Sequence, residues 1–315
     1  MNPLTRHRCY LAAAALLLFL SCQAGEEPPP ALAAADTGHP VAGWSRLRYA
    51  AGGMVGSVST QLELADAAHR DMQVPPYTAL ANTAFQVATS PVMRLGIHVH
   101  TTTLFVDSIT EGTIWFDPGS GAVLQRDRLR PGWKGSRKIY RFGGAGASRI
   151  RLEPRDKAEA EQPSADWSKI KKSYFPYDVA TSGCKVVSDP ILLLYLVSLP
   201  DYVNDSRSVQ ICTFFDDALY RVWLEPQGIE RLEADYTVKS AGTLRKVSGR
   251  QETLKLLLRV EPVTAGADTS NFELLELRGT LAIHLDTRSR LPVRISGERA
   301  GFGRLSIGLV EAESQ

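Results

Sequence analysis

The densest run of chemically capable side chains lies between residues 126 and 151. This window holds nine cations and one acid, Asp127, with the aromatic residues Trp133, Tyr140 and Phe142 interleaved among them. The cations are Arg126, Arg128, Arg130, Lys134, Arg137, Lys138, Arg141, Arg149 and Arg151. Such a local field attracts phosphate and carboxylate groups, so the segment predicts a surface that binds an anionic lipid headgroup, lipopolysaccharide phosphate or acidic glycan. The alternative is a solvated strand face whose cations pair with acids elsewhere in the chain.

A histidine pair, His98 and His100, is a second and weaker candidate site. Residues two apart on a strand point to the same face, so both imidazoles could reach one metal ion. A third ligand is lacking in the neighbouring sequence, since threonines follow and the next acid is Asp107; His284 could approach only through the fold. The alternative is two histidines on a solvated strand face, and we expect no metal.

Motifs for nucleophilic or phosphate chemistry are lacking. Ser168 and Lys171 have a Ser-x-x-Lys spacing, but the Ser-Asp-Asn and Lys-Thr-Gly motifs that accompany it in penicillin-binding enzymes are missing. The sequence also contains no Gly-x-Ser-x-Gly nucleophile elbow and no phosphate-binding glycine loop. We therefore expect no catalytic residue, no cofactor and no enzymatic activity.

The N-terminus has the layout of a bacterial lipoprotein signal. Arg6 and Arg8 precede an apolar run over 10–20, and Ser21 stands directly before Cys22. That run is about half of the ~20 residues that a membrane-spanning helix needs, so it indicates a cleaved signal over 1–21 with acyl chains on Cys22. Phe19 and Leu20 depart from the usual lipoprotein pattern, and the alternative is ordinary cleavage near Ala24 or within 31–35.

The residue after the cysteine predicts the destination of the exported protein. Gln23 stands where an Asp would retain a lipoprotein at the inner membrane, which favours the periplasmic face of the outer membrane. Residues 22–42 are rich in Pro and Ala without apolar periodicity and predict a flexible tether. Loss of Arg6 and Arg8 with the signal brings the formal net charge of +2 to zero. Neither this charge nor an exported location suits a nucleic-acid partner.

Two cysteines remain in the domain beyond the tether. Cys184 and Cys212 form an even pair in an oxidising compartment and predict a disulfide. The alternative is two buried free thiols. Without companion histidines at ligand spacing, the pair does not indicate a zinc site.

These candidate residues must be positioned by β-strands and one helix. Alternation of apolar and polar residues predicts strands over 47–49, 58–64, 94–106, 112–117, 138–142, 150–153, 209–215, 219–224, 232–238, 253–260, 277–285, 292–296 and 304–310. Residues 155–172 are charged and predict a loop. Ser188 or Asp189 can cap a helix that starts at Pro190, continues through an apolar run and stops before Pro200. Because it is apolar on all sides, this helix should be buried.

Several stretches of the chain resemble an exported bacterial family known as domain of unknown function 3108. They are Arg48-Tyr49 with Gly52, Gly53 and Gly56, then 114–118, 138–142, Asp189-Pro190, Arg278-Gly279, Asp286 and 291–295. The resemblance extends over 44–312 and includes no catalytic motif. It implies a β-rich envelope protein without an assigned reaction, in which the cations of 126–151 could belong to the family scaffold.

The sequence predicts three parts and a mainly β fold. A signal peptide over 1–21 and a tether over 22–42 precede a β-rich domain over 43–315. We expect an antiparallel curved sheet, as a half-open barrel or sandwich, with one prominent buried helix at about 189–199. The expected function is a non-enzymatic envelope lipoprotein that binds a hydrophobic or anionic ligand. The alternative is an interaction or scaffold protein with a filled β core.

Overall fold

The computed structural model describes residues 42–53, 56–67, 92–103, 107–177, 183–199 and 207–314. They form one 14-stranded antiparallel sheet in the order β8-β7-β6-β5-β4-β3-β2-β1-β14-β13-β12-β11-β10-β9. The strands are β1 (Arg46–Gly53), β2 (Gly56–Ala67), β3 (Val92–Thr103), β4 (Asp107–Phe116), β5 (Val123–Arg130), β6 (Ser136–Gly143), β7 (Gly146–Glu153), β8 (Lys169–Pro176), β9 (Val209–Phe215), β10 (Ala218–Ser240), β11 (Thr243–Pro262), β12 (Arg278–Asp286), β13 (Pro292–Arg299) and β14 (Gly303–Glu313). The helical segments are α1 (Lys157–Ala160), η2 (Pro190–Leu192), α3 (Leu193–Ser198) and η3 (Thr269–Asn271).

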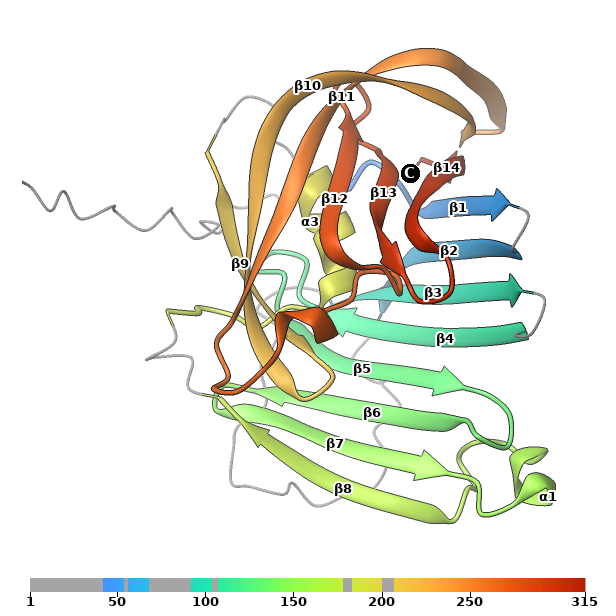
Figure 1. Ribbon diagram of the computed structural model, residues 1–315, viewed down its shortest axis with the longest axis vertical. Helices are drawn as coiled ribbons and strands as arrows, with labels where there is room; N and C mark the ends of the chain where they lie inside the picture. Colours follow the sequence, from blue (N-terminus) through green and yellow to red (C-terminus); the bar gives the residue numbers. More distant parts are fainter. Residues whose placement is uncertain are drawn as a thin grey trace, which may run out of the picture.

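The sheet curves around α3 and remains open. In Figure 1, β2 to β8 form a stack across the lower half, while β10 to β14 rise above it and bend over the yellow helix. Three parallel pairs join β10 to β14, between 237–239 and 311–313, in addition to the antiparallel order. β8 and β9 end the sheet at its two edges, so the strands do not close into a barrel. This confirms the predicted mainly β class, with a curved sheet and one buried helix.

The helix forms where its capping residues predicted it. The carboxylate of Asp189 accepts a hydrogen bond from the backbone N–H of Ile191 at 2.9 Å, and Pro190 is the first residue of η2. η2 continues directly into α3, where Leu193, Leu194 and Tyr195 are fully buried. At its far end Ser198 accepts a hydrogen bond from Trp44 Nε1 at 3.1 Å, which ties the helix to the start of the domain. The expected range of about 189–199 is thus confirmed.

The side chains of the sheet fall on two faces, and only one of them packs on the helix. We call the face toward α3 the inner face and the opposite one the outer face. Leu62, Leu95 and Ile114 are fully buried on the inner face of neighbouring strands, and the ring of Phe116 packs edge-on against Tyr195 with 5.0 Å between centroids. A single hydrophobic core therefore joins both halves of the sheet to the helix.

The structure corrects the expected elements in three places. The loop predicted for 155–172 contains α1 and the start of β8, whose lysines hid its alternation. β5 has no predicted counterpart, because charged residues occupy its inward positions. The strands predicted over 219–224 and 232–238 are parts of one long strand, β10, whose register with β11 shifts between Pro226 and Ile229.

The segment between β7 and β8 covers part of the outer face. Trp167 is buried there against Ile139, Ile150 and Leu152, and these four residues form a small cluster separate from the main core. No helix in the described part of the chain is long and apolar enough to span a membrane. The predicted signal, Cys22 and all but the last residue of the predicted tether lie outside the described residues.

Candidate functional site

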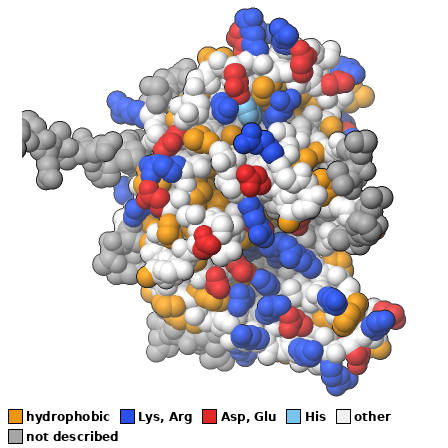
Figure 2. Space-filling model, in the orientation of Figure 1, with side chains coloured by type: hydrophobic (Ala, Val, Ile, Leu, Met, Phe, Trp, Pro, Cys, Tyr) orange, Lys and Arg blue, Asp and Glu red, His pale blue; other side chains and the backbone are white. Residues whose placement is uncertain are grey.

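The predicted cationic cluster is divided between the two faces of the sheet. Strand alternation and register place six of the nine cations on the inner face of β5, β6 and β7: Arg126, Arg128, Arg130, Lys138, Arg149 and Arg151. Arg137 and Arg141 point to the outer face of β6. Lys134 lies in the β5–β6 turn, where its Nζ is 4.9 Å from the centre of the Trp133 ring. Figure 2 shows Lys and Arg side chains gathered over the lower half of the molecule, over β5 to β8.

Four inner-face cations stand in one line across four strands. Arg128 pairs with Lys138, Lys138 with Arg151, and Arg151 with Lys171 on the edge strand β8. We call these four residues the cation row. Neighbouring strands are about 4.8 Å apart, and like charges placed directly opposite destabilise a sheet. An anion that binds to the row would therefore relieve the repulsion between these cations.

Acids of the chain neutralise only part of the row. Lys138 Nζ lies 2.6 Å from the carboxylate of Asp216, which comes from the β9–β10 turn. Arg151 pairs with Glu153 on its own strand. Arg128 and Lys171 make no ion pair with any residue that the structure describes. Lys171 is exposed and the other three are half-buried, so the row leads from solvent toward the core.

The electrostatics of Arg128 and Lys138 reflect this arrangement. The pKa of Arg128 is lowered to about 10, mainly by burial and then by the nearby charges of Arg126 and Arg130, while Glu273 and Glu276 oppose the shift. Burial also lowers the pKa of Lys138, although Asp216 opposes the shift. Both cations are held where water solvates them poorly, which is the situation that a bound anion relieves.

Two of the predicted cations have structural partners instead. Arg126 is buried and its Nη1 lies 2.9 Å from the carboxylate of Asp189, the residue that caps η2. Arg137 binds Asp127 on the outer face, with its Nη2 2.6 Å from one carboxylate oxygen. Arg126 thus belongs to the helix anchor and Arg137 to a different surface, although the sequence grouped them with the row.

The cysteine and histidine pairs are both placed by the structure. Cys184 and Cys212 are joined in a disulfide that links the segment before η2 to β9. His98 and His100 share the outer face of β3, as alternation predicted, but each faces its own acid: His100 Nε2 is 2.7 Å from Asp107, and His98 Nδ1 is 4.0 Å from Glu111. Among the described residues no three His, Cys, Asp or Glu side chains converge as a metal site would require.

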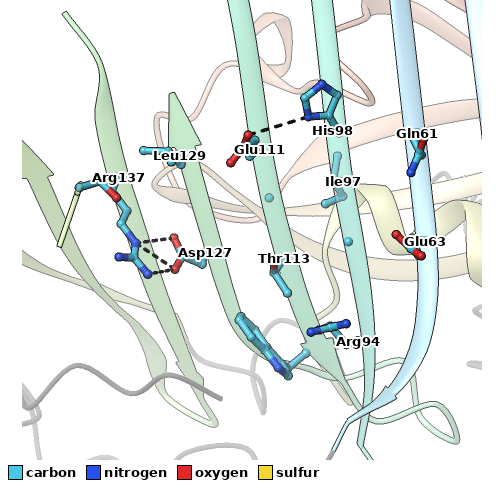
Figure 3. Close-up of a pocket in the computed structure, with 14 residues that line it drawn as sticks. Gln61, Glu63, Arg94, Ile97, His98, Glu111, Thr113, Asp127, Leu129 and Arg137 are labelled. Carbon is cyan, nitrogen blue, oxygen red and sulfur yellow. Dashed lines mark hydrogen bonds and ion pairs between the residues drawn. The ribbon is translucent and has the colours of Figure 1, made fainter. Parts of the chain in front are cut away.

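The outer face also contains a groove that the sequence did not predict. It has a volume of about 580 Å³ and lies across β2 to β6. Figure 3 shows Arg94, His98 and Glu111 around it, with Asp127 and Arg137 joined at one side. Its residues come from five strands and from the segment before β8. The groove could therefore have been predicted only if the register between these strands had been known.

No protein-family model, no curated protein and no solved structure matches this chain.

Proposed function

We propose that this protein is a non-enzymatic lipoprotein of a Gram-negative envelope that binds anionic groups of envelope material on its cation row. The signal over 1–21, the lipid on Cys22 and the position at the outer membrane belong to the same proposal. They rest on the N-terminal sequence. The β domain would then face anionic lipid headgroups or acidic glycans within the reach of its tether.

The observation that carries the proposal is the alignment of Arg128, Lys138, Arg151 and Lys171 across four strands. A scaffold strand face would pair its cations with acids on neighbouring strands, as Arg46 does with Glu63 at 2.9 Å. In the cation row, each residue has another cation as its cross-strand neighbour. Phosphate or carboxylate oxygens would supply the hydrogen-bond acceptors that Arg128 and Lys171 lack among the described residues.

The geometry also favours binding from the sheet edge. Lys171 is exposed on β8, and half-buried Arg151 and Lys138 follow inward. An anionic group would meet Lys171 first and then reach cations whose charges are less screened by water and salt. Arg149 lies beside the row, its guanidinium carbon 4.6 Å from the centre of the Phe175 ring.

Two adjacent lysines allow a matched test. Lys171 and Lys172 are both exposed on β8, but Lys171 points to the inner face and Lys172 to the outer one. We expect the domain to co-sediment with phosphatidylglycerol vesicles and not with phosphatidylcholine vesicles, less strongly as salt increases. Lys171→Glu should weaken binding about tenfold, and Lys172→Glu should leave it within about twofold.

The two variants also separate a specific surface from general charge attraction. Equal losses in both variants, or binding that does not depend on salt, would contradict the proposal. A soluble acidic polysaccharide in place of vesicles shows whether the anion comes from a glycan or a lipid. With either ligand, Lys171→Glu should weaken binding and Lys172→Glu should not.

The alternative function is an interaction or scaffold protein with a filled core. The observation that favours it is the position of α3, which occupies the space that an apolar ligand would need. Beside Arg126 and Ile191 the structure leaves a cavity of only about 30 Å³, about one water molecule. This alternative predicts that a hydrophobic probe such as a fluorescent fatty acid does not bind the folded domain. A saturable fluorescence change would favour the hydrophobic-ligand function instead.

A further inference from the structure

The outer-face groove is a cup with a floor of small residues. Glu63, Gly96, Thr113 and Asp127 are cross-strand neighbours on β2 to β5. Gly96 and Thr113 have the smallest side chains of this line and lie in its middle. Glu63 and Asp127 close its two ends. The depression therefore arises because two short side chains stand between longer ones.

The rim of the cup contains both hydrogen-bond donors and acceptors. His98 and Glu111 stand beside the floor on one side, and Arg94 and Trp115 on the other, because they are two residues away along β3 and β4. Arg94 is exposed and makes no ion pair with any described residue. Trp115 also lines the groove, but its side chain is buried against Val92 and Leu124, so the accessible donor on this side is the Arg94 guanidinium.

The charges of the groove are nearly balanced. Asp127 is neutralised by Arg137, and Glu63 lies 2.9 Å from Arg46 outside the groove. Glu111 and Arg94 remain as one acid and one base on opposite sides. A strongly anionic ligand would meet the three carboxylates of the groove, and a strongly cationic one its guanidinium groups. Electrostatic complementarity therefore favours an uncharged ligand.

From these observations we infer that the groove binds a neutral oligosaccharide. Sugar hydroxyls both donate and accept hydrogen bonds, so they can satisfy carboxylates that only accept and guanidinium groups that only donate. A volume of about 580 Å³ lies within the usual range of ligand sites. This site is on the opposite face from the cation row and does not depend on the function proposed for that row.

Gly96 offers a direct test of the site. A Cβ atom added there would meet its nearest neighbour, the Glu63 carbonyl oxygen, at 3.6 Å, which is ordinary contact. Gly96→Val should therefore fold, and it would fill the floor of the cup. The matched control is Gly52→Val on β1, where the nearest atom is 4.0 Å away and which does not line this groove. Both changes place a β-branched residue, which strands favour, at a glycine.

The experiment is calorimetric titration with tetrasaccharides of glucose and of N-acetylglucosamine. We expect saturable binding of one of them with a Kd of about 1 mM or tighter, and little change between low and high salt. Gly96→Val should weaken binding at least about tenfold without lowering Tm, and Gly52→Val should not weaken it. Lys171→Glu should leave sugar binding unchanged, which separates this inference from the cation-row proposal.

Three results would overturn the inference. They are failure of both tetrasaccharides to bind, binding only of an acidic tetrasaccharide, and unchanged binding by Gly96→Val. If Gly96→Val does not fold, Arg94→Gln and Glu111→Gln take its place, since both side chains line the groove and Glu111 is exposed, as is Arg94. Each of these should weaken sugar binding, and full affinity in both would be equally decisive against the site.

Discussion

Arg126 and Asp189 form an ion pair of 2.9 Å in the core, with 8% of one side chain and none of the other exposed to solvent. Asp189 also caps η2, so the pair fixes the start of the buried helix to the inner face of β5. Burial raises the pKa of the Asp189 carboxyl, and the charge of Arg126 opposes that shift. The Asp189 side chain is thus both the charge partner of Arg126 and the cap of η2.

This pair predicts a double-mutant result. Asp189→Asn keeps an oxygen that can cap the helix but leaves the Arg126 charge buried without its partner. We expect the free energy of unfolding in urea to fall by about 3 kcal/mol, and Arg126→Met in the same chain to restore most of it. A double variant as unstable as Asp189→Asn would contradict this prediction, because it would show that the unpaired Arg126 charge is not the source of the loss.

We predict that the charge of Arg128 contributes to anion binding but does not stabilise the fold. Its cation is partly desolvated and lies near Arg126 and Arg130, which lower its pKa. Arg128→Met removes this unfavourable charge while keeping much of the side-chain volume. We expect stability in urea to be unchanged or about 1 kcal/mol higher, and binding to anionic vesicles to be weaker. A variant that is clearly less stable would mean that Arg128 has a structural role that its contacts do not reveal.

His284 predicts a pH dependence of stability. It is 5% exposed, and burial lowers its pKa, while Glu230, 2.9 Å from Nδ1, raises it. Because the folded pKa lies below the unfolded value of 6.5, the unfolded chain takes up the proton first as pH falls. Stability should thus be fully present above about pH 6.5 and decline below it.

The measurement for His284 is a series of urea unfolding curves between about pH 5 and 8. His284→Gln should flatten the decline, and His98→Gln, at an exposed position, serves as the control. If the decline persists unchanged in His284→Gln, another group is responsible for it.

The disulfide predicts a loss of stability on its removal. Cys184 and Cys212 close a loop with a sequence separation of 28. The chain-entropy model gives about 3–4 kcal/mol for a loop of this length, so Cys184→Ser with Cys212→Ser should lose about that amount in urea. Each single variant should also abolish the mobility shift between reducing and non-reducing gels. Absence of that shift in the native chain would mean that the thiols are free.

Cys22 predicts the membrane anchor. Cys22→Ala should abolish incorporation of labelled palmitate and release the protein from the membrane fraction, because no acyl acceptor remains at the signal junction. Cys9→Ala is the control, since Cys9 would be removed with the signal. Labelling that persists in Cys22→Ala would exclude this anchor.

Local patterns in the sequence determined much of the fold. Asp189, Pro190 and the apolar run after them specify a capped, buried helix because capping and amphipathicity are decided within one or two turns. Alternation located most strands for a similar reason, since the two faces of a strand are defined by adjacent residues. Alternation did not predict β5 and β8, because their inward positions hold Arg126, Arg128 and Lys171 where a strand of the core has apolar residues.

The candidate sites, in contrast, were decided by register between strands. Arg128 and Lys171 belong to one row only through Lys138 on β6 and Arg151 on β7, and a shift of one residue in any of the three pairings would put part of the row on the other face. The sequence placed Arg126 and Arg137 in the same cluster, yet the tertiary structure put one in the core and the other outside. Local propensity determines the elements of this protein, but the cross-strand hydrogen bonds determine which charges meet.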